Sequence, residues 1–286
     1  MYREIVIHNM TLDERIRTDI EERLSGKEIS AAKALAKFGF SAKGLPLYFT
    51  GNRNARTVFV NLNPGRDKED ADNNWSKDIE KYKFDQSSSE SFIKGLIERS
   101  KNYGLLDKDR SDSFDEKQAA FLTPWKDCGI DLPQEPNWHD KNTRLEAKKN
   151  VLCQKLQLEL IPYASSTFDN IRGDEEKRLF LPFIDTLLDE IFAKPRLYVI
   201  FASAKFEELF KFYNTSKNSQ TFVIPRETKK VLLKSTYASF KVIEIHYNGK
   251  TQKALIARTF PSQGLGRAFD LMQKYRKSCY EEFIKS

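Results

Sequence analysis

The residues best placed to do chemistry come directly after a short apolar run, residues 57–62. The run is rich in β-branched side chains and stops at Asn63-Pro64-Gly65, as expected for a buried strand that ends in a tight turn. Pro64 fixes its own φ and lacks an N–H, while Gly65 allows conformations that side chains forbid. The Asn63 amide can donate and accept hydrogen bonds. Ligands of open α/β sheets bind beyond the carboxyl ends of the strands, so Asn63 is the first candidate for a catalytic residue.

Two later segments end in similar clusters of turn-forming and polar residues. A strand expected at residues 156–161 stops at Pro-Tyr-Ala-Ser-Ser, residues 162–166. A hairpin arm expected at residues 253–259 stops at Phe-Pro-Ser-Gln-Gly, residues 260–264. Because the carboxyl ends of parallel strands lie at the same edge of a sheet, we expect the three clusters to converge on one site.

Hydrophobic periodicity predicts the elements that must position these clusters. Thr11 and Glu14 predict a capping box at the start of a helix that ends before Gly26, and Asn248-Gly249 marks a hairpin turn. The other expected helices cover residues 30–38, 90–101, 175–192, 204–213 and 265–283, and the other expected strands cover residues 47–50, 58–62, 196–202 and 240–246. Strands that alternate with helices predict an α/β fold with a mainly parallel sheet covered on both faces.

The chain is expected to form one domain over residues 1–286, with a helical extension at residues 1–45. A long, highly charged insertion covers residues 66–150. A structureless loop of this length is uncommon inside a compact domain, so we expect helices and a wall of the active site there.

The composition of the chain limits which partners and which cellular compartment are expected. The 286 residues carry a formal charge of +7 and give a pI near 9.1, which is compatible with DNA or a nucleotide and equally with a basic protein that binds neither. The three cysteines are widely separated, the start lacks a signal-peptide pattern, and no apolar run reaches the length of a membrane span. We expect a cytoplasmic protein with reduced thiols and no membrane partner. A monomer is favoured, and no metal-ligand cluster or cofactor motif is apparent.

The order of these pieces resembles the uracil-DNA glycosylase superfamily. Residues 60–65, Val-Asn-Leu-Asn-Pro-Gly, are similar to the first motif of its mismatch-specific and single-strand-selective branches, and residues 260–265, Phe-Pro-Ser-Gln-Gly-Leu, are similar to its second motif. The resemblance covers roughly residues 46–65 and 155–275. It implies a three-layer α/β/α fold around a mainly parallel, four-stranded sheet. It also implies cofactor-free hydrolysis of the N-glycosidic bond of a damaged or deaminated base in DNA.

The resemblance implies roles for the residues of the two motifs. Asn63 would hold the attacking water, and the turn formed by Pro64 and Gly65 would offer the Gly65 N–H to a carbonyl of the base. Ser262 would contact a DNA phosphate, and Arg267 would add a charged contact near the start of the closing helix. The structural alternative for Asn63 is a turn-former that bonds its own backbone.

Three further residues are expected near the base. Trp75 would stack on the flipped base, although a surface or core-anchoring tryptophan is the alternative. Tyr163 would line the pocket or simply pack, and Ser165, or its neighbour Ser166, stands where some relatives carry an asparagine that reads the base. Phe260 replaces the histidine or asparagine of the second motif and cannot donate a hydrogen bond to the base.

Phe260 and the missing asparagine keep two alternatives to a glycosylase open. One is a non-catalytic module that retains the fold and binds nucleic acid or a nucleotide. The other is a hydrolase or sensor of free nucleotides, which salt dependence would separate from a DNA-binding protein.

Overall fold

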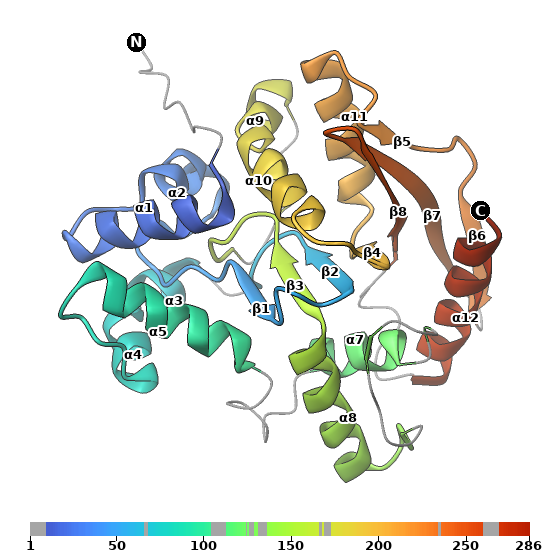
Figure 1. Ribbon diagram of the computed structural model, residues 1–286, viewed down its shortest axis with the longest axis horizontal. Coiled ribbons are helices and arrows are strands. Elements are labelled where there is room, and N and C mark those ends of the chain that lie inside the picture. Colours follow the sequence, from blue (N-terminus) through green and yellow to red (C-terminus); the bar gives the residue numbers. More distant parts are fainter. Residues whose placement is uncertain are drawn as a thin grey trace. The chain divides into compact units, whose positions relative to one another are not determined.

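The computed structural model describes residues 10–65, 68–103, 113–123, 125, 129–130, 136–165, 168, 173–233, 236–259 and 269–286. The strands of this described part form an eight-stranded sheet with the order β1-β3-β2-β4-β8-β7-β5, and β6 pairs with β7 (Figure 1). Contacts divide the chain into two compact units. The first comprises Met1–Phe49, Asn61–Ser100 and Leu158–Ala193, and the second comprises Thr50–Val60, Lys101–Gln157 and Lys194–Ser286.

The first helix of the first unit forms as its sequence predicts. Helix α1 covers Leu12–Leu24, and Thr11 and Glu14 make the predicted reciprocal capping box. Helix α2 (Ser30–Leu35) continues into the 3₁₀ turn η1 (Ala36–Phe38), which ends at Gly39 with a left-handed φ of 92°. The insertion contributes the further helices α3 (Lys68–Asn73), α4 (Trp75–Tyr82) and α5 (Ser89–Lys101) to this unit.

The single helix predicted at residues 175–192 is wrong, because two helices occupy this segment. Helix α9 covers Asp174–Arg178, and α10 covers Leu181–Phe192. Pro182 lies in the first turn of α10, where a missing N–H costs nothing, whereas in the middle of a longer helix it would break the hydrogen-bond ladder.

Three predicted strands lie where the two units divide the chain. They are β1 (Phe49–Gly51), β2 (Thr57–Asn61) and β3 (Leu156–Glu159). Every residue of β2 is buried, as expected for a strand covered on both faces. The single-domain assignment stays a prediction beside this division.

The predicted four-stranded, mainly parallel sheet is too simple. In the second unit β4 (Tyr198–Phe201) pairs in parallel with both β2 and β8 (Lys250–Ile256). Strand β7 (Thr236–Tyr247) is antiparallel to β8, β5 (Phe222–Val223) and β6 (Lys229–Leu233). The β7–β8 hairpin turns at Asn248 and Gly249 with φ of 48° and 73°, which confirms the predicted tight turn. The sheet is therefore mixed, and its three-layer arrangement stays a prediction.

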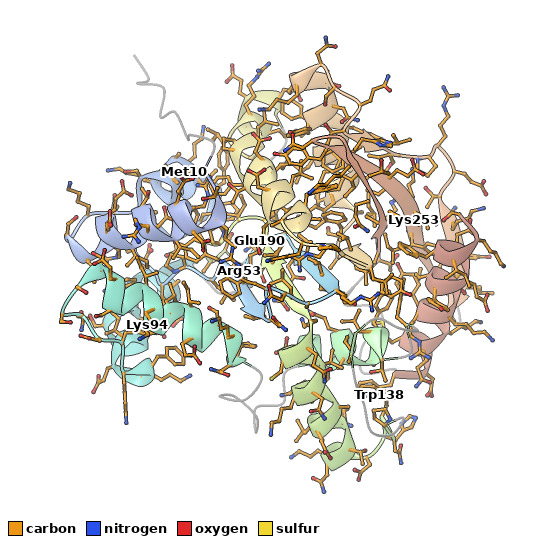
Figure 2. All side chains as sticks on the ribbon, in the orientation of Figure 1. Met10, Arg53, Lys94, Trp138, Glu190 and Lys253 are labelled. Atoms are coloured by element: carbon orange, nitrogen blue, oxygen red, sulfur yellow. The ribbon has the colours of Figure 1, made fainter. Side chains whose placement is uncertain are left out.

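An aromatic core holds the second unit together. Its described helices are α7 (Ser113–Leu122), α8 (Lys141–Gln154), α11 (Lys205–Lys217) and α12 (Phe269–Lys285). Trp125 lies 4.9 Å from Tyr198 and 5.6 Å from Phe283, measured between ring centroids. Trp138, labelled in Figure 2, stacks on Phe269 at 5.9 Å. Among the described helices, none is both long and apolar enough to span a membrane.

Candidate functional site

The turns that follow β2 and β3 are held together by hydrogen bonds within the first unit. The Asn63 side chain donates from Nδ2 to the carbonyl oxygens of Pro64 and Ser165, each at 2.9 Å. The Ser165 N–H donates back to the Pro64 carbonyl at 3.1 Å. Two of the three predicted clusters therefore meet, and Asn63 is the side chain that joins them.

These bonds set the direction of the Asn63 amide. Both hydrogens of Nδ2 are directed at backbone carbonyls, so Oδ1 points away from those carbonyls as an acceptor of fixed direction. Asn63 is half-buried, and Gly65 is exposed with open space where a side chain would begin. The arrangement can hold a water at Oδ1 and lets a ligand approach the backbone of Gly65.

Tyr163 and Ser165 face the interior of the first unit. The Tyr163 side chain is 1% exposed, and its hydroxyl donates to Asp19 Oδ2 at 2.7 Å. Ser165 is also buried, and its backbone holds Asn63. Both residues shape the turn in this conformation, and their contact with a base stays a prediction.

Trp75 has a structural place in the first unit. It begins α4 and stacks on Phe92 of α5, with 5.7 Å between centroids and 17° between ring planes. The Arg23 guanidinium lies 4.8 Å from the Trp75 ring centroid. These contacts favour the core-anchoring alternative, and stacking on a base stays a prediction.

The second motif cannot be placed in the same way. Phe260, Ser262 and Arg267 lie outside the described residues, as does Ser166. The last described residue before the motif is Thr259, whose Oγ1 accepts a hydrogen bond from the Ser239 N–H at 2.6 Å.

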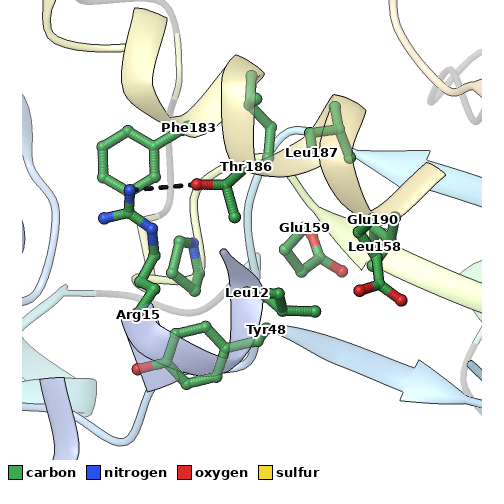
Figure 3. Close-up of a pocket in the computed structure, with 11 residues that line it drawn as sticks. Leu12, Arg15, Tyr48, Leu158, Glu159, Phe183, Thr186, Leu187 and Glu190 are labelled. Atoms are coloured by element: carbon green, nitrogen blue, oxygen red, sulfur yellow. Dashed lines mark hydrogen bonds between the residues drawn. The ribbon is translucent and has the colours of Figure 1, made fainter. Parts of the chain in front are cut away.

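Sequence reasoning missed a buried polar cluster on α1. Asp19 Oδ2 accepts hydrogen bonds from the hydroxyls of Tyr48 at 2.9 Å and Tyr163 at 2.7 Å. Arg15 lies one turn earlier, donates to Thr186 Oγ1 at 3.3 Å, and its guanidinium lies 4.3 Å from the Phe183 ring centroid (Figure 3). Because Tyr163 belongs to the turn after β3, Asp19 anchors that turn to α1.

A sequence signal for this cluster exists in the helical spacing of α1. The buried positions of α1 are Leu12, Arg15, Ile16, Asp19 and Ile20, which recur at the i, i+3, i+4 spacing of a core-facing stripe. Two charged residues on an apolar stripe need partners inside the protein. That mismatch could have marked Arg15 and Asp19 as members of a buried network.

Burial controls the electrostatics of the cluster. It raises the pKa of the Asp19 carboxyl from an ordinary 3.8 to about 6, against the opposing effects of the Tyr163 hydrogen bond and the Arg15 charge. Burial likewise raises the pKa of Tyr48 and Tyr163 well above 10.0, so both hydroxyls remain protonated donors at neutral pH.

The raised pKa of Asp19 predicts a pH-dependent stability. Well below pH 3.8 the carboxyl is protonated in both the folded and unfolded chains, whereas well above pH 6 both are ionised and the folded state bears the cost of burying the charge. We expect the free energy of unfolding of the wild type, relative to Asp19→Asn, to fall by about 2 kcal/mol between pH 4 and pH 7. Urea denaturation of both proteins across this range measures it. A difference that is flat with pH would contradict the assignment.

A small cavity lies beside this cluster. Its volume is about 20 Å³, and Figure 3 shows Arg15, Tyr48, Glu159 and Glu190 around it. The Asn61 side chain at the end of β2 donates to Glu159 Oε1 at 3.0 Å. A cavity of this size holds about one water molecule, so it is not a pocket for a nucleobase.

No described group of three or more His, Cys, Asp or Glu side chains is arranged to hold a metal ion. Similarity to known proteins does not identify this site. Comparisons with protein-family models, with curated proteins and with solved structures find no match.

Proposed function

We propose that the turns after β2 and β3 bind a base in DNA and that Asn63 positions the water that hydrolyses its N-glycosidic bond. The observation that supports this most directly is the fixed Asn63 amide, whose Nδ2 donates to two backbone carbonyls at 2.9 Å. A side chain held in this way needs no reorganisation when it binds a water, which is the general requirement of a preorganised site.

The chemistry of the reaction suits a neutral amide at this position. Cleavage builds positive charge on the sugar and negative charge on the departing base. Asn63 Oδ1 accepts a hydrogen bond from the water and orients it toward C1′. The C1′–N bond breaks, the water oxygen bonds to C1′, and the proton of the water passes to the departing base anion or to solvent, because an amide is too weak a base to take it. The activation barrier is therefore lowered by the positioning of the water and by electrostatic stabilisation of the developing charges. The exposed Gly65 backbone offers its N–H to a carbonyl of the base.

The charge of the chain supports a polyanionic partner. The net charge is +7, and in the second unit three cations surround one carboxylate. Glu207 lies 2.8 Å from Lys211, 2.9 Å from Lys241 and 3.1 Å from Arg258. Lys241 and Glu207 of this cluster are largely buried, so the support comes from the net positive charge, which attracts a polyanion such as DNA.

The function is tested by cleavage of labelled oligonucleotides. Substrates containing uracil, hypoxanthine, xanthine or mismatched thymine, in single and double strands, are incubated with the wild type and then treated with alkali. We expect alkali-labile product from at least one substrate. Intact oligonucleotides across the whole panel would contradict the proposal.

A non-catalytic binding module is the second candidate. Both amide hydrogens of Asn63 are directed at backbone carbonyls, which also suits a residue that only shapes a turn. This candidate predicts DNA affinity that falls steeply with salt, survives Asn63→Ala and gives no abasic product. A sensor or hydrolase of free nucleotides would instead show a shallow salt dependence, because it contacts few phosphates.

A further inference from the structure

In the described part of the chain, strand β6 pairs with β7 along one edge and with no strand along the other. In an antiparallel pair, residues alternate between those that exchange hydrogen bonds with the partner strand and those whose N–H and C=O point the other way. Alternate backbone groups of β6 therefore point away from β7, where another strand can bind them.

An open groove of about 400 Å³ follows this edge. Four consecutive residues of β6, Lys229 to Leu232, line one wall. Successive side chains of a strand point to opposite faces, so a groove that touches four in a row runs along the strand's edge. The opposite wall is one face of α12, which includes Lys274, Ser278 and Lys285 at helical spacing. Figure 1 shows β6 beside α12, and Lys229 lies 3.5 Å from Glu282 of that helix.

The positive charge of the groove favours an acidic ligand. Its four lysines outnumber its two glutamates, and Lys229 is already bridged to Glu227 at 3.4 Å and to Glu282 at 3.5 Å. Lys230, Lys274 and Lys285 are exposed and make no ion pair with any residue that the structure describes. These three ammonium groups are available to carboxylates of a ligand.

The face of β6 that carries Leu232 also carries Lys230, and both side chains are exposed. Leu232 on β6 lies directly opposite Tyr237 on β7. Their exposed fractions are 47% and 63%. A strand added at the β6 edge would present alternate side chains to this pair and to the lysines of α12.

We infer that the groove between β6 and α12 binds an extended peptide segment in which acidic and apolar residues alternate, by adding a strand to the sheet. The acidic side chains face Lys274 and Lys285, and the apolar ones cover Leu232 and Tyr237. A second copy of this chain is a poorer occupant, because its own lysine-bearing β6 edge would repel this one. Nucleic acid is also poorer, because it lacks a backbone that pairs with a strand edge.

Fluorescence anisotropy of a labelled hexapeptide, Glu-Val-Glu-Val-Glu-Val with blocked ends, tests the inference. Saturable binding is expected, and the order Glu-Glu-Glu-Val-Val-Val should bind at least tenfold more weakly, an order-of-magnitude expectation from the lost alternation. Only one edge of the peptide meets β6, so the N–H groups of one alternate set of residues bond to β6 and those of the other set do not. N-methylation of the first set (one phase) should abolish binding, and N-methylation of the second set (the other phase) should be tolerated.

Charge reversal on α12 supplies the matched variants. The double change Lys274→Glu with Lys285→Glu should weaken peptide binding by about tenfold, while Lys277→Glu, exposed on the same helix outside the groove, should change it by less than about twofold. Absent binding, equal binding of both peptide orders, tolerance of methylation in both phases, or displacement of the peptide by a ten-residue oligothymidylate would each overturn the inference. A dimer that dissociates when the peptide binds would assign the edge to a second copy instead. None of these results depends on base excision.

Discussion

Asp19→Ala is expected to lower the free energy of unfolding by about 3 kcal/mol at pH 6, because it removes the acceptor of two buried hydroxyls and a carboxylate whose charge acts on the buried Arg15. Asp19 is 2% exposed, and the hydroxyls of Tyr48 and Tyr163 both donate to its Oδ2. Alanine leaves the two hydroxyl donors without their acceptor and Arg15 without the negative charge of Asp19. The cavity beside them has room for only about one water molecule. Urea denaturation measures the loss.

Two further variants distinguish the stability contributed by the buried hydrogen-bond network from the effect of any substitution on α1. Glu21→Ala removes a half-exposed carboxylate of α1 whose partner, Arg17, lies 3.7 Å away, and it should cost less than about 0.5 kcal/mol. Tyr163→Phe keeps the ring and removes one donor, so its loss should be smaller than that of Asp19→Ala, about 1 kcal/mol. If Asp19→Ala and Glu21→Ala cost the same, the buried network does not stabilise the first unit.

Gly51→Ala is expected to lower the free energy of unfolding by at least about 3 kcal/mol. Gly51 ends β1 with a φ of 84°, which side chains rarely adopt. A Cβ atom there would overlap the carbonyl oxygen of Lys155 and lie 2.7 Å from that of Leu152. The Lys155 carbonyl also accepts the Asn52 N–H at 2.9 Å, so the backbone cannot move away without breaking that bond.

Gly26→Ala is the matched control for Gly51→Ala. Gly26 has a similar φ of 81°, but nothing lies within 4 Å of the added Cβ position. Its replacement should therefore cost only the backbone strain, about 1 kcal/mol. Thermal or urea unfolding of both variants measures the difference. Equal losses would mean that the close approach of Lys155 and Leu152 has no energetic consequence.

Features set by local sequence were predictable. The capping box of Thr11 and Glu14, the left-handed turn at Asn248 and Gly249, and the buried strand that ends before Asn63 each depend on a few neighbouring residues. Their chemistry leaves one favourable backbone conformation, so the sequence pattern predicts it. The meeting of the turns after β2 and β3 followed from topology alone, and the bond from Asn63 to Ser165 agrees with it.

Features set by distant contacts were not predictable in the same way. Asp19 and Tyr163 are 144 residues apart in the sequence, so nothing local pairs them, although Asp19 on an apolar helical stripe signals a missing partner. The resemblance to uracil-DNA glycosylases predicts that Trp75 stacks on a base, but in the structure Trp75 stacks on Phe92 and the Arg23 guanidinium lies over its ring. The edge strands β5 and β6 show weak hydrophobic periodicity because they are short or half-exposed. The number of strands in the sheet was therefore underestimated.

We propose that Asn63 positions the hydrolytic water. The most direct test is the single-turnover rate of abasic-site formation on the best oligonucleotide substrate, for the wild type, Asn63→Ala and Asn142→Ala. Asn142 is an exposed residue of α8, so its replacement should leave the rate unchanged. We expect Asn63→Ala to lower the rate by roughly 100-fold, at a temperature where urea unfolding shows every protein folded. Equal rates for wild type and Asn63→Ala, or no product from the wild type, would contradict the claim.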